Sequence, residues 1–282
     1  MDEVVSALID LALVEDVGLG DVTSEYFVPA DRMARAMVLG KTDGILAGTE
    51  IAKEVFQRVD EETGVNILLD DGSHIAPGAI VMEVRGAARS LLTAERTALN
   101  FLQRLSGVAT KTAEFVEAVR GTGAVILDTR KTTPGWRFLQ KAAVVSGGGQ
   151  NHRMGLYDRA MVKDNHLVAE GGLEALQAGI KELKEENPGV QVELEVDRLE
   201  QMEAFLTLEG VDYILLDNMD NETLAKAVAM RSENGPLLEA SGGVNLETVR
   251  GIAETGVKYI SVGALTHSAI ALDLSLEFVN VD

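Results

Sequence analysis

The hydrophobic pattern of the first 120 residues predicts a small module that combines helices with an antiparallel sheet. Apolar residues at helical spacing predict an amphipathic helix over residues 1–14. Between residues 34 and 84, short apolar runs separated by turn signals predict strands, with one helix near 49–62. A longer helical pattern covers about 88–120, and Gly107 is the position at which it could divide.

After Gly123 the pattern changes to short β-branched runs that alternate with helices. The predicted strands are Ala124–Leu127, Ala160–Val162, Val190–Val196, Tyr213–Leu216, Pro236–Ala240 and Tyr259–Val262. The predicted helices lie near 136–145, 172–186, 199–208, 221–231 and 245–255. Such alternation is typical of a parallel sheet covered by helices, which can form an open doubly wound sheet or a closed barrel.

Residues with candidate polar chemistry, from their side chains or their backbone, lie at the ends of all six predicted strands, and this favours the barrel. They are Asp128–Lys131, Lys163, Glu195 with Asp197, Asp217, Ser241-Gly242-Gly243 and Gly263-Ala264. An open sheet gathers its ligand at one switch point, whereas a barrel gathers it from all strand ends. Residues 271–278 alternate with period two, so they are expected to return as a strand on the N-terminal module.

Composition describes a globular protein with a strongly acidic surface. The 282 residues are 46% hydrophobic and 25% charged, enough for one large domain or two modest ones. The net charge of −20 argues against nucleic-acid binding and against docking on anionic membranes. The chain has no cysteine, which excludes disulfides and thiolate metal sites, and no apolar run approaches about 20 residues. We expect a cytoplasmic protein.

One segment departs from this acidic background. Between Asp128 and Lys163 there are seven Lys and Arg residues and two acidic ones, Asp128 and Asp158. Seven minus two gives about +5 locally, so the rest of the chain carries about −25. Concentrated positive charge in an acidic protein indicates a pocket for a small polyanion, because it focuses anionic ligands.

Two glycine turns have the form of a phosphate site. Ser241-Gly242-Gly243 precedes a predicted helix with Asn245 as its N-cap, so backbone N–H groups and a helix dipole could face an anion. Gly263-Ala264 supplies a second turn at the next strand end. Each turn taken singly could need glycine for backbone reasons alone. Their adjacency favours a sugar phosphate.

Carboxylates end two neighbouring strands, at Glu195 and Asp217. Hard oxygen ligands suit Mg²⁺, which keeps several waters and bridges to substrate phosphates. Glu193 points the same way as Glu195 but lies deeper in the barrel, and Asp197 lies beyond the regular strand. These two are kept as reserves.

The basic segment supplies a cationic wall made of Arg130, Lys131, Arg153 and Lys163. Arginine pairs a carboxylate through two hydrogen bonds, and lysine adds a point charge. Lys131 or Lys163 could instead form a Schiff base, as in barrel aldolases, and the spacing does not exclude this.

The remaining candidates are single residues. His152 and His267 are candidates for secondary contacts, and no histidine spacing suggests a zinc site. Arg96, on the long helix, has by pattern alone the character of a solvated charge.

Taken together, the chain resembles quinolinate phosphoribosyltransferase. The matching stretches are Glu15–Ser24, Glu95–Gly107, Asp128–Gly135, Gly147–Tyr157, Lys163–His166, Leu216–Asn218, Glu239–Val244 and Ser261–Ser268. The resemblance implies transfer of phosphoribosyl from phosphoribosyl pyrophosphate to quinolinate with decarboxylation, giving nicotinate mononucleotide, pyrophosphate and CO₂ for NAD biosynthesis. It implies Mg²⁺ and no organic cofactor. It also implies an N-terminal α/β sandwich with an antiparallel sheet (1–107, joined by 269–282) and a six-stranded α/β barrel (108–268), an incomplete TIM-like barrel.

The resemblance also implies site residues and a homodimer with shared active sites, without nucleic-acid or membrane partners. In it, Arg96 reaches the substrate carboxylate of the partner subunit. The implied binding residues are Arg96, Thr129, Arg130, Lys131, His152, Arg153, Lys163, Glu195, Asp217, Ser241, Gly242, Gly243, Val262, Gly263, Ala264 and His267. Lys131, Glu195 and Asp217 are the candidate catalytic residues, and Glu195 and Asp217 the Mg²⁺ positions, directly or through water.

Four alternatives remain open at this point. A paralogue of the same fold, such as the molybdenum-transport-associated relatives, would bind another ligand, and nicotinate phosphoribosylation would use a substrate with one carboxylate. A Schiff-base lyase and a phosphate-binding barrel without catalysis complete the set. The intact Thr129–Thr132 and Lys163–His166 motifs favour quinolinate over the paralogue.

Overall fold

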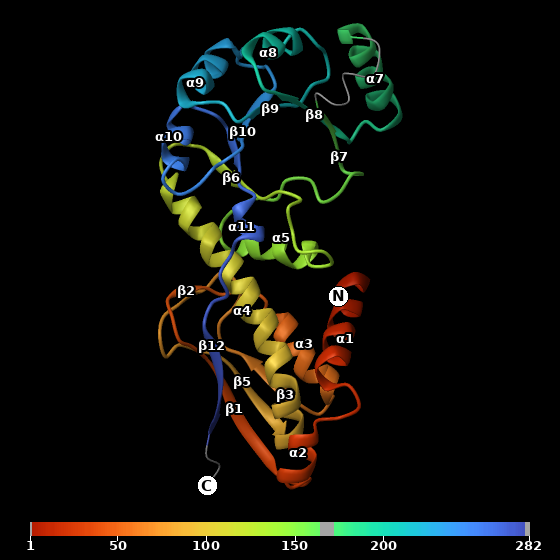
Figure 1. Ribbon diagram of the computed structural model, residues 1–282, viewed down its shortest axis with the longest axis vertical. Coiled ribbons are helices and arrows are strands. Elements are labelled where there is room, and N and C mark those ends of the chain that lie inside the picture. The colour runs from red at the N-terminus through yellow and green to blue at the C-terminus, as the bar shows by residue number, and fades with distance from the viewer. Residues whose placement is uncertain (1, 164–171, 280–282) are drawn as a thin grey trace. The chain divides into compact units, whose positions relative to one another are not determined.

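The computed structural model describes residues 2–163 and 172–279. It divides into two compact units, which are described separately (Figure 1). The first contains residues 1–113, 132–148 and 265–282, and the second contains residues 114–131 and 149–264. The domain boundary expected between residues 107 and 108 stays a prediction. Among the described residues, no helix is long and apolar enough to cross a bilayer.

The first unit is organised around a four-stranded antiparallel sheet in the order β12-β1-β5-β3. Its elements are α1 (Glu3–Val17), α2 (Val22–Phe27), β1 (Met33–Gly40), β2 (Gly44–Ile45), α3 (Thr49–Val59), β3 (Gly64–Ile67), β4 (His74–Ile75), β5 (Ile80–Ala87), α4 (Ala88–Ala118), α5 (Arg137–Ser146), α11 (Ala264–His267) and β12 (Leu274–Val279). β12 pairs with β1 with Ala36 opposite Phe278, which confirms the predicted return of the C-terminal segment.

The long helix α4 runs from Ala88 to Ala118 without a break, so Gly107 does not divide it. Its glycine serves close packing instead, because an added Cβ would collide with the main-chain carbonyl of Ile270. Leu99 and Leu102 of the same helix are buried in the core of the unit together with Phe56 of α3. Burial of such side chains is the main stabilising contribution, roughly 2 kcal/mol for each one fully buried.

The second unit carries the six predicted parallel strands. Its elements are β6 (Val125–Leu127), β7 (Arg159–Val162), α7 (Gly172–Glu186), β8 (Gln191–Val196), α8 (Leu199–Phe205), β9 (Tyr213–Asp217), α9 (Asn221–Met230), β10 (Leu237–Ser241), α10 (Val249–Glu254) and β11 (Tyr259–Ser261). Figure 1 shows α7, α8, α9 and α10 on the outer side of the curved sheet.

The order of these strands is that of a barrel that stays open between two of its strands. Spatially the sheet runs β6-β11-β10-β9-β8-β7, so the first and last strands of the series pair with each other. Such pairing requires the sheet to curl around. In the described residues no ladder joins β6 to β7, and on that side of β6 a single bridge links Leu127 to Gln150. The predicted fold class is therefore confirmed, with the opening between β6 and β7.

Candidate active site

Strand periodicity sorts the inner face of the second unit into layers. Successive side chains of a strand point to opposite faces, so residues two apart share a face at different depths. Lys163, Glu195, Asp217 and Ser241 come from the carboxyl ends of four neighbouring strands. Two positions earlier on the same strands lie Met161, Glu193, Leu215 and Glu239. We call the first set the mouth layer and the second set the floor layer.

A cavity of about 530 Å³ opens at this end of the sheet. It is lined by Thr129, Arg130, Lys131, His152, Arg153, Met161, Lys163, Glu195, Leu215, Asp217, Asn218, Glu239, Ser241, Gly242, Gly243 and Ser261. The structure thus gathers around one cavity eleven residues that the sequence proposed for one site. Asp164, Asn165 and His166, which belong to a motif used above, lie outside the described residues.

Five proposed residues are not among those lining the cavity. Val262, Gly263 and Ala264 follow β11, where the inward residue is Ser261. Val262 is buried and its N–H donates to the carbonyl of Leu127. His267 and Arg96 belong to the first unit, where both are exposed.

Basic side chains form one wall of the cavity. Arg153 donates to the carbonyl of Arg159 at 3.3 Å and to Sδ of Met161 at 3.4 Å, so its side chain lies along β7. Burial and the neighbouring charge of Arg130 lower the pKa of Arg153. An anionic ligand beside these two guanidinium groups would offset their mutual repulsion.

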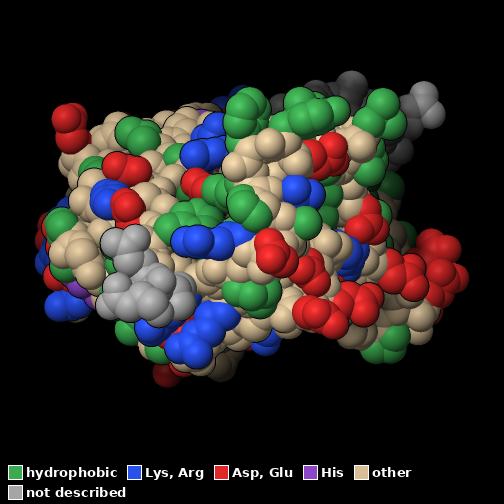
Figure 2. Space-filling view, turned by 90° about the horizontal axis from the view of Figure 1, so that it is seen from below, with side chains coloured by type: hydrophobic (Ala, Val, Ile, Leu, Met, Phe, Trp, Pro, Cys, Tyr) green, Lys and Arg blue, Asp and Glu red, His purple; other side chains and the backbone are tan. Residues whose placement is uncertain are grey.

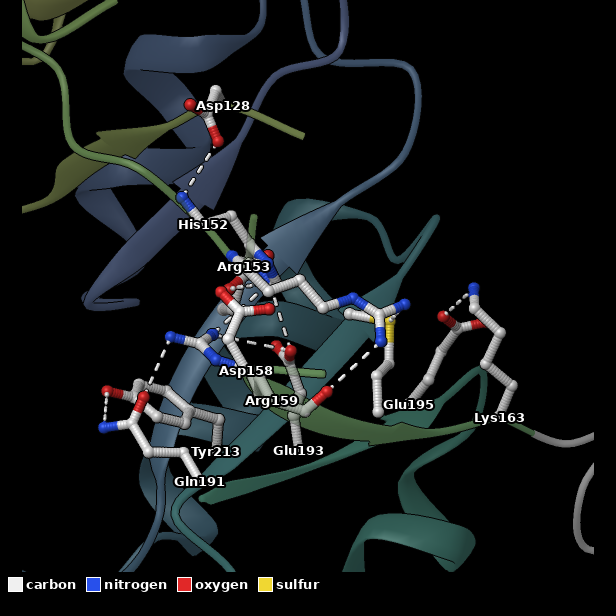
Figure 3. A network of polar contacts seen from close by, with 12 residues as sticks. Asp128, His152, Arg153, Asp158, Arg159, Lys163, Gln191, Glu193, Glu195 and Tyr213 are labelled. Atoms are coloured by element: carbon white, nitrogen blue, oxygen red, sulfur yellow. Dashed lines mark hydrogen bonds and ion pairs between the residues drawn. The ribbon is translucent and has the colours of Figure 1, made fainter. Parts of the chain in front are cut away.

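The mouth layer already contains an ion pair. Lys163 Nζ lies 2.5 Å from Glu195 Oε2, with side-chain exposures of 43% and 16% (Figure 3). Asp217 accepts a hydrogen bond from the Asn218 side-chain amide at 2.9 Å. Carboxylate oxygens at the ends of two adjacent strands have the chemistry that Mg²⁺ prefers, which usually takes one or two protein carboxylates.

The Ser-Gly-Gly turn has the backbone that an anion cup needs. Gly242 and Gly243 have φ of +98° and +59°, in the left-handed region that favours glycine. A Cβ on Gly242 would collide with the side chain of Asn218. Asn218 itself has φ of +53° and donates its N–H to the carbonyl of Ser241 at 2.8 Å.

The helix after this turn does not begin where the sequence suggested. Asn245 accepts hydrogen bonds from the N–H groups of Glu247 and Thr248, which forms a turn, and α10 begins at Val249. Asn245 nevertheless makes the side-chain hydrogen bonds expected of an N-cap, in a turn that precedes the regular helix, so only the predicted start of that helix was too early. Any anion at the cup therefore relies on the glycine backbone.

The floor layer contains buried charge. Glu193 and Glu239 are each 0% exposed and His152 is 7% exposed. His152 Nε2 lies 3.1 Å from Glu193 Oε2 and 3.4 Å from Glu239 Oε2, while Arg159 Nη1 lies 3.5 Å from Glu193 Oε2. Figure 3 shows His152 and Arg159 converging on Glu193. Despite these distances, no oxygen of either glutamate accepts a hydrogen bond of good geometry from the described residues.

The environment moves the pKa values of these groups apart. Burial alone would lower the pKa of His152, but the two carboxylates raise it to about 9. Nε2 of His152 faces the two carboxylates, and the backbone nitrogen of Arg153 lies 2.7 Å from Nδ1 on the other side of the ring. Burial raises the pKa of Glu239. Burial acts the same way on Glu193, but contact with His152 and the charge of Arg159 lower the pKa of Glu193.

Arg159 is fixed from its other side. Its Nη2 donates to Gln191 Oε1 at 3.2 Å, and its guanidinium carbon lies 4.3 Å from the ring centroid of Tyr213. A half-buried arginine that is stacked on a ring is a fixed source of positive charge. The negative charge of Glu193 therefore has a permanent partner.

Comparison with known proteins agrees with this site. The N-terminal domain family of quinolinate phosphoribosyl transferase matches residues 21–106, and its C-terminal domain family matches residues 108–277. The chain belongs to the quinolinate phosphoribosyltransferase family. The expected membership is confirmed.

Individual relatives cover nearly the whole chain. The nicotinate-nucleotide pyrophosphorylase [carboxylating] of Mycobacterium leprae is 45% identical over 272 residues, which is 94% of each chain. The chloroplastic enzyme of the same name from Arabidopsis thaliana is 43% identical, over 96% of this chain and 82% of its own. The structure of the nicotinate-nucleotide pyrophosphorylase from Francisella tularensis has a TM-score of 0.90 at 36% identity, covering 98% and 96%.

Several lining residues were missed by sequence reasoning: Met161, Leu215, Asn218, Glu239 and Ser261. Four of them lie two positions before Lys163, Asp217, Ser241 and Gly263, so the strand period that placed Glu193 below Glu195 could have found them. Asn218 carried no such signal, because its role follows from its backbone conformation.

Proposed function

We propose that the cavity of the second unit binds quinolinate and phosphoribosyl pyrophosphate and joins them. The reaction forms nicotinate mononucleotide, with release of pyrophosphate and CO₂, and serves NAD biosynthesis. One observation carries this proposal: a basic wall, a glycine anion cup and two carboxylates line a single cavity in a protein of net charge −20. Each part matches one feature of the two substrates.

The basic wall matches the dicarboxylate. Arg130 and Arg153 would bind its carboxylates through paired hydrogen bonds, and Lys131 and Lys163 would add charge. Thr129 and His152 complete the same wall. Lys163 already contacts Glu195, so a ligand carboxylate there would compete with Glu195 for the same ammonium group. Four cations around one cavity favour two carboxylates over the single one of nicotinate.

The glycine turns match the phosphoribosyl group. Ser241, Gly242 and Gly243 would hold the 5′-phosphate through backbone N–H groups. Val262, Gly263, Ala264 and His267 are proposed for the same phosphate from the following strand end. Of these assignments, the first three rest on cavity-lining positions and the last four rest on family resemblance.

Glu195 and Asp217 match the sugar and its metal. They would hold Mg²⁺, which supplies positive charge to the pyrophosphate when it is bound. The carboxylates also favour the positive charge that develops on the ribose as its bond to pyrophosphate breaks. Lys131 lies on the same cavity and would stabilise the departing anion. We propose these three as the catalytic residues.

The chemistry needs no organic cofactor. The pyridine nitrogen attacks the anomeric carbon as pyrophosphate leaves, and no proton has to be removed from that nitrogen. The ring is then a pyridinium, which accepts the electron pair of the adjacent C–C bond when CO₂ departs. Up to the departure of CO₂, the reaction requires only residues that bind and orient the substrates and residues that stabilise charge.

We also propose a homodimer in which Arg96 completes the partner's cavity. Arg96 is exposed on α4, and the first unit exposes large apolar side chains on α1 and α2, among them Leu11, Val14, Tyr26 and Phe27. Figure 2 shows apolar side chains among charged ones on one face of the molecule. Such patches mark interaction surfaces. We propose a cytoplasmic location and neither nucleic-acid nor membrane partners.

Shared sites can be tested by mixing two inactive variants. Arg96→Ala and Lys131→Ala should each be inactive, and exchange of subunits should restore part of the activity because one cavity in the mixed dimer keeps both residues. Arg104→Ala, at an exposed position of the same helix, is the matched control and should retain activity alone. Absence of recovery after proven exchange would contradict a shared site.

The function itself is tested by product formation. The protein with phosphoribosyl pyrophosphate and Mg²⁺ should convert quinolinate to nicotinate mononucleotide with CO₂ release, and nicotinate should not replace it. Conversion of nicotinate alone would keep the transfer but remove the decarboxylation. Turnover of neither by a folded dimer would indicate a paralogue, and borohydride trapping at Lys131 or Lys163 would indicate a Schiff-base lyase.

A further inference from the structure

The proposed reaction leaves one proton unassigned. When CO₂ departs, the electron pair of the broken C–C bond stays on the ring carbon, and this carbon has to take a proton before the product is complete. Without a donor the pair can recapture CO₂. The mechanism above names no residue for this step, and the inference that follows rests on the proposed function.

The mouth layer is a poor source of that proton. Lys163 is most useful when charged, because it binds anions, and arginine, which the neighbouring basic wall supplies, is not an acid at any working pH. Glu195 contacts Lys163, Asp217 accepts a hydrogen bond from Asn218, and both are already proposed for the metal and the ribose. A donor has to be a group that holds its proton near neutral pH and can release it.

Glu239 has the position for this role. It lies in β10, two residues before Ser241, and it lines the cavity while being 0% exposed. Bulk water therefore does not compete with it once the cavity is filled. Ser261 and Leu215, its neighbours on the adjoining strands, line the same floor and bring no second charge to it.

The groups around Glu239 favour its neutral form. His152 Nε2 lies closer to Glu193, at 3.1 Å, than to Glu239, at 3.4 Å, and Arg159 lies 3.5 Å from Glu193. His152 turns Nε2 toward both glutamates, and Tyr259 of β11 is the cross-strand neighbour of Glu239. Two carboxylates in one dry site cannot both be charged at low cost, so the second keeps a proton. Burial acts in the same direction and raises the pKa of Glu239.

The cost of this arrangement also needs an explanation. Burying two carboxylates without good hydrogen bonds costs several kcal/mol per charge, and a leucine or methionine pair would fill a barrel floor without that cost. Burial of such groups in a ligand cavity is typical of functional sites.

We propose that Glu239 is the acid that protonates the ring carbon vacated by CO₂. The C–C bond to the carboxylate breaks, its electron pair takes the proton of the Glu239 carboxyl, and Glu239 is left as a carboxylate. It regains a proton from water after nicotinate mononucleotide leaves and the cavity opens to solvent. Glu193, His152 and Arg159 act as positioning residues that keep the second charge of the floor on Glu193.

The test separates the two halves of the reaction. Pyrophosphate release reports transfer, and CO₂ release with nicotinate mononucleotide formation reports the later steps. Glu239→Gln keeps the shape and a hydrogen-bond donor but has no acidic proton. We expect pyrophosphate release at a nearly normal rate and CO₂ release slowed about 100-fold, within the usual contribution of a general acid. Quinolinate mononucleotide, the undecarboxylated intermediate, should accumulate and be detected by mass spectrometry.

Glu239→Asp is the matched variant. It is a worse fit to the floor but keeps an acid, so it should release CO₂ faster than Glu239→Gln. A purely structural role predicts the opposite order, because glutamine fills the space better than aspartate. Equal slowing of pyrophosphate and CO₂ in Glu239→Gln, or normal rates of both, would overturn the proposal.

A measurement on the unmodified protein covers the case in which the variants fail to fold. The ratio of CO₂ to pyrophosphate in the first turnover should fall with rising pH well before the ordinary lysine pKa of about 10.4. A ratio that stays constant up to that range would assign the proton to Lys131 or Lys163 instead. Absence of pyrophosphate with quinolinate would overturn the proposed function itself, which is a separate outcome.

Discussion

The mouth and the floor of the cavity contain the same kinds of side chain but differ in what surrounds them. Glu195 of the mouth faces Lys163 across a partly exposed pair, whereas Glu193, two residues earlier on the same strand, is fully buried between His152 and Arg159. Solvent screens the first pair and not the second. One strand therefore presents two carboxylates with different properties. The mouth is suited to exchanging ligands, and the floor to holding a fixed distribution of charge and protons.

The largest expected effect follows from removing the cation that the two floor glutamates share. His152→Leu leaves the buried carboxylate of Glu193 with Arg159 as its remaining charged partner, so we expect a loss of about 3–5 kcal/mol in the free energy of unfolding. Chemical denaturation measures this. His267→Leu is the control, because His267 is exposed and should change stability little. A neutral result for His152→Leu would remove the distinction between floor and mouth.

The mouth is expected to show the reverse: a large effect on activity and a small one on stability. Asp217→Asn should slow pyrophosphate release by roughly 10²–10³-fold, as loss of one electrostatic contact to a transition state does, with the denaturation midpoint unchanged. Asp197→Asn is the control, since Asp197 is exposed and follows β8 outside the cavity lining. Steady-state kinetics of pyrophosphate release by both variants test this prediction. Similar slowing in both would indicate a general effect of removing a negative charge.

The proton of Glu239 should appear in the pH dependence of stability. Its pKa is raised in the folded protein above the ordinary 4.5, so folding retains a proton that the unfolded chain releases. Its stabilising contribution is therefore complete below pH 4.5 and is lost as the pH rises toward the folded pKa. In that window the stability of the unmodified protein should fall by about 1.4 kcal/mol per pH unit relative to Glu239→Gln. Urea titrations of both proteins between pH 5 and 8 measure the difference, and parallel curves would show that Glu239 is ionised.

The fold of the second unit could be predicted from the sequence because a parallel barrel repeats one simple pattern. All six strands lie within two residues of their expected bounds, and the polar strand ends converge as expected. The floor could be predicted only in part. The strand period could have placed Glu239 below Ser241, but among 45 acidic residues the sequence did not show which partners would surround it. Its position emerges from the strand register and from the loop that brings His152 into the barrel.

Local turn chemistry was a second limit. Asn245 has the sequence signature of an N-cap, yet its side chain closes a turn and α10 starts four residues later. Asn218 adopts a left-handed conformation, which its sequence context did not signal. In both cases the outcome depends on where neighbouring backbone groups lie, which is a tertiary property.

A smaller effect is expected at Gly242, in the glycine turn that forms the proposed anion cup. Gly242→Ala places a side chain at φ +98° and against Asn218, so we expect a loss of about 1–3 kcal/mol from strain. Binding of inorganic phosphate should weaken in parallel if the cup is where the phosphate of the substrate sits. Gly189→Ala is a matched control, because a Cβ there has open space. Normal phosphate binding in Gly242→Ala would move the phosphate away from the cup.

The smallest expected effect concerns the ion pair of the mouth. Lys163→Met breaks the contact with Glu195, yet the lysine side chain is 43% exposed, so the free energy of unfolding should change by less than about 1 kcal/mol. The same variant should weaken quinolinate binding, because a ligand carboxylate would replace Glu195 as the partner of Lys163. Denaturation and calorimetric titration with quinolinate test the two statements separately. If Lys163→Met lowered the free energy of unfolding as much as His152→Leu, the mouth ion pair would stabilise the fold as strongly as the floor contacts do. The proposed difference between the two layers would then be wrong.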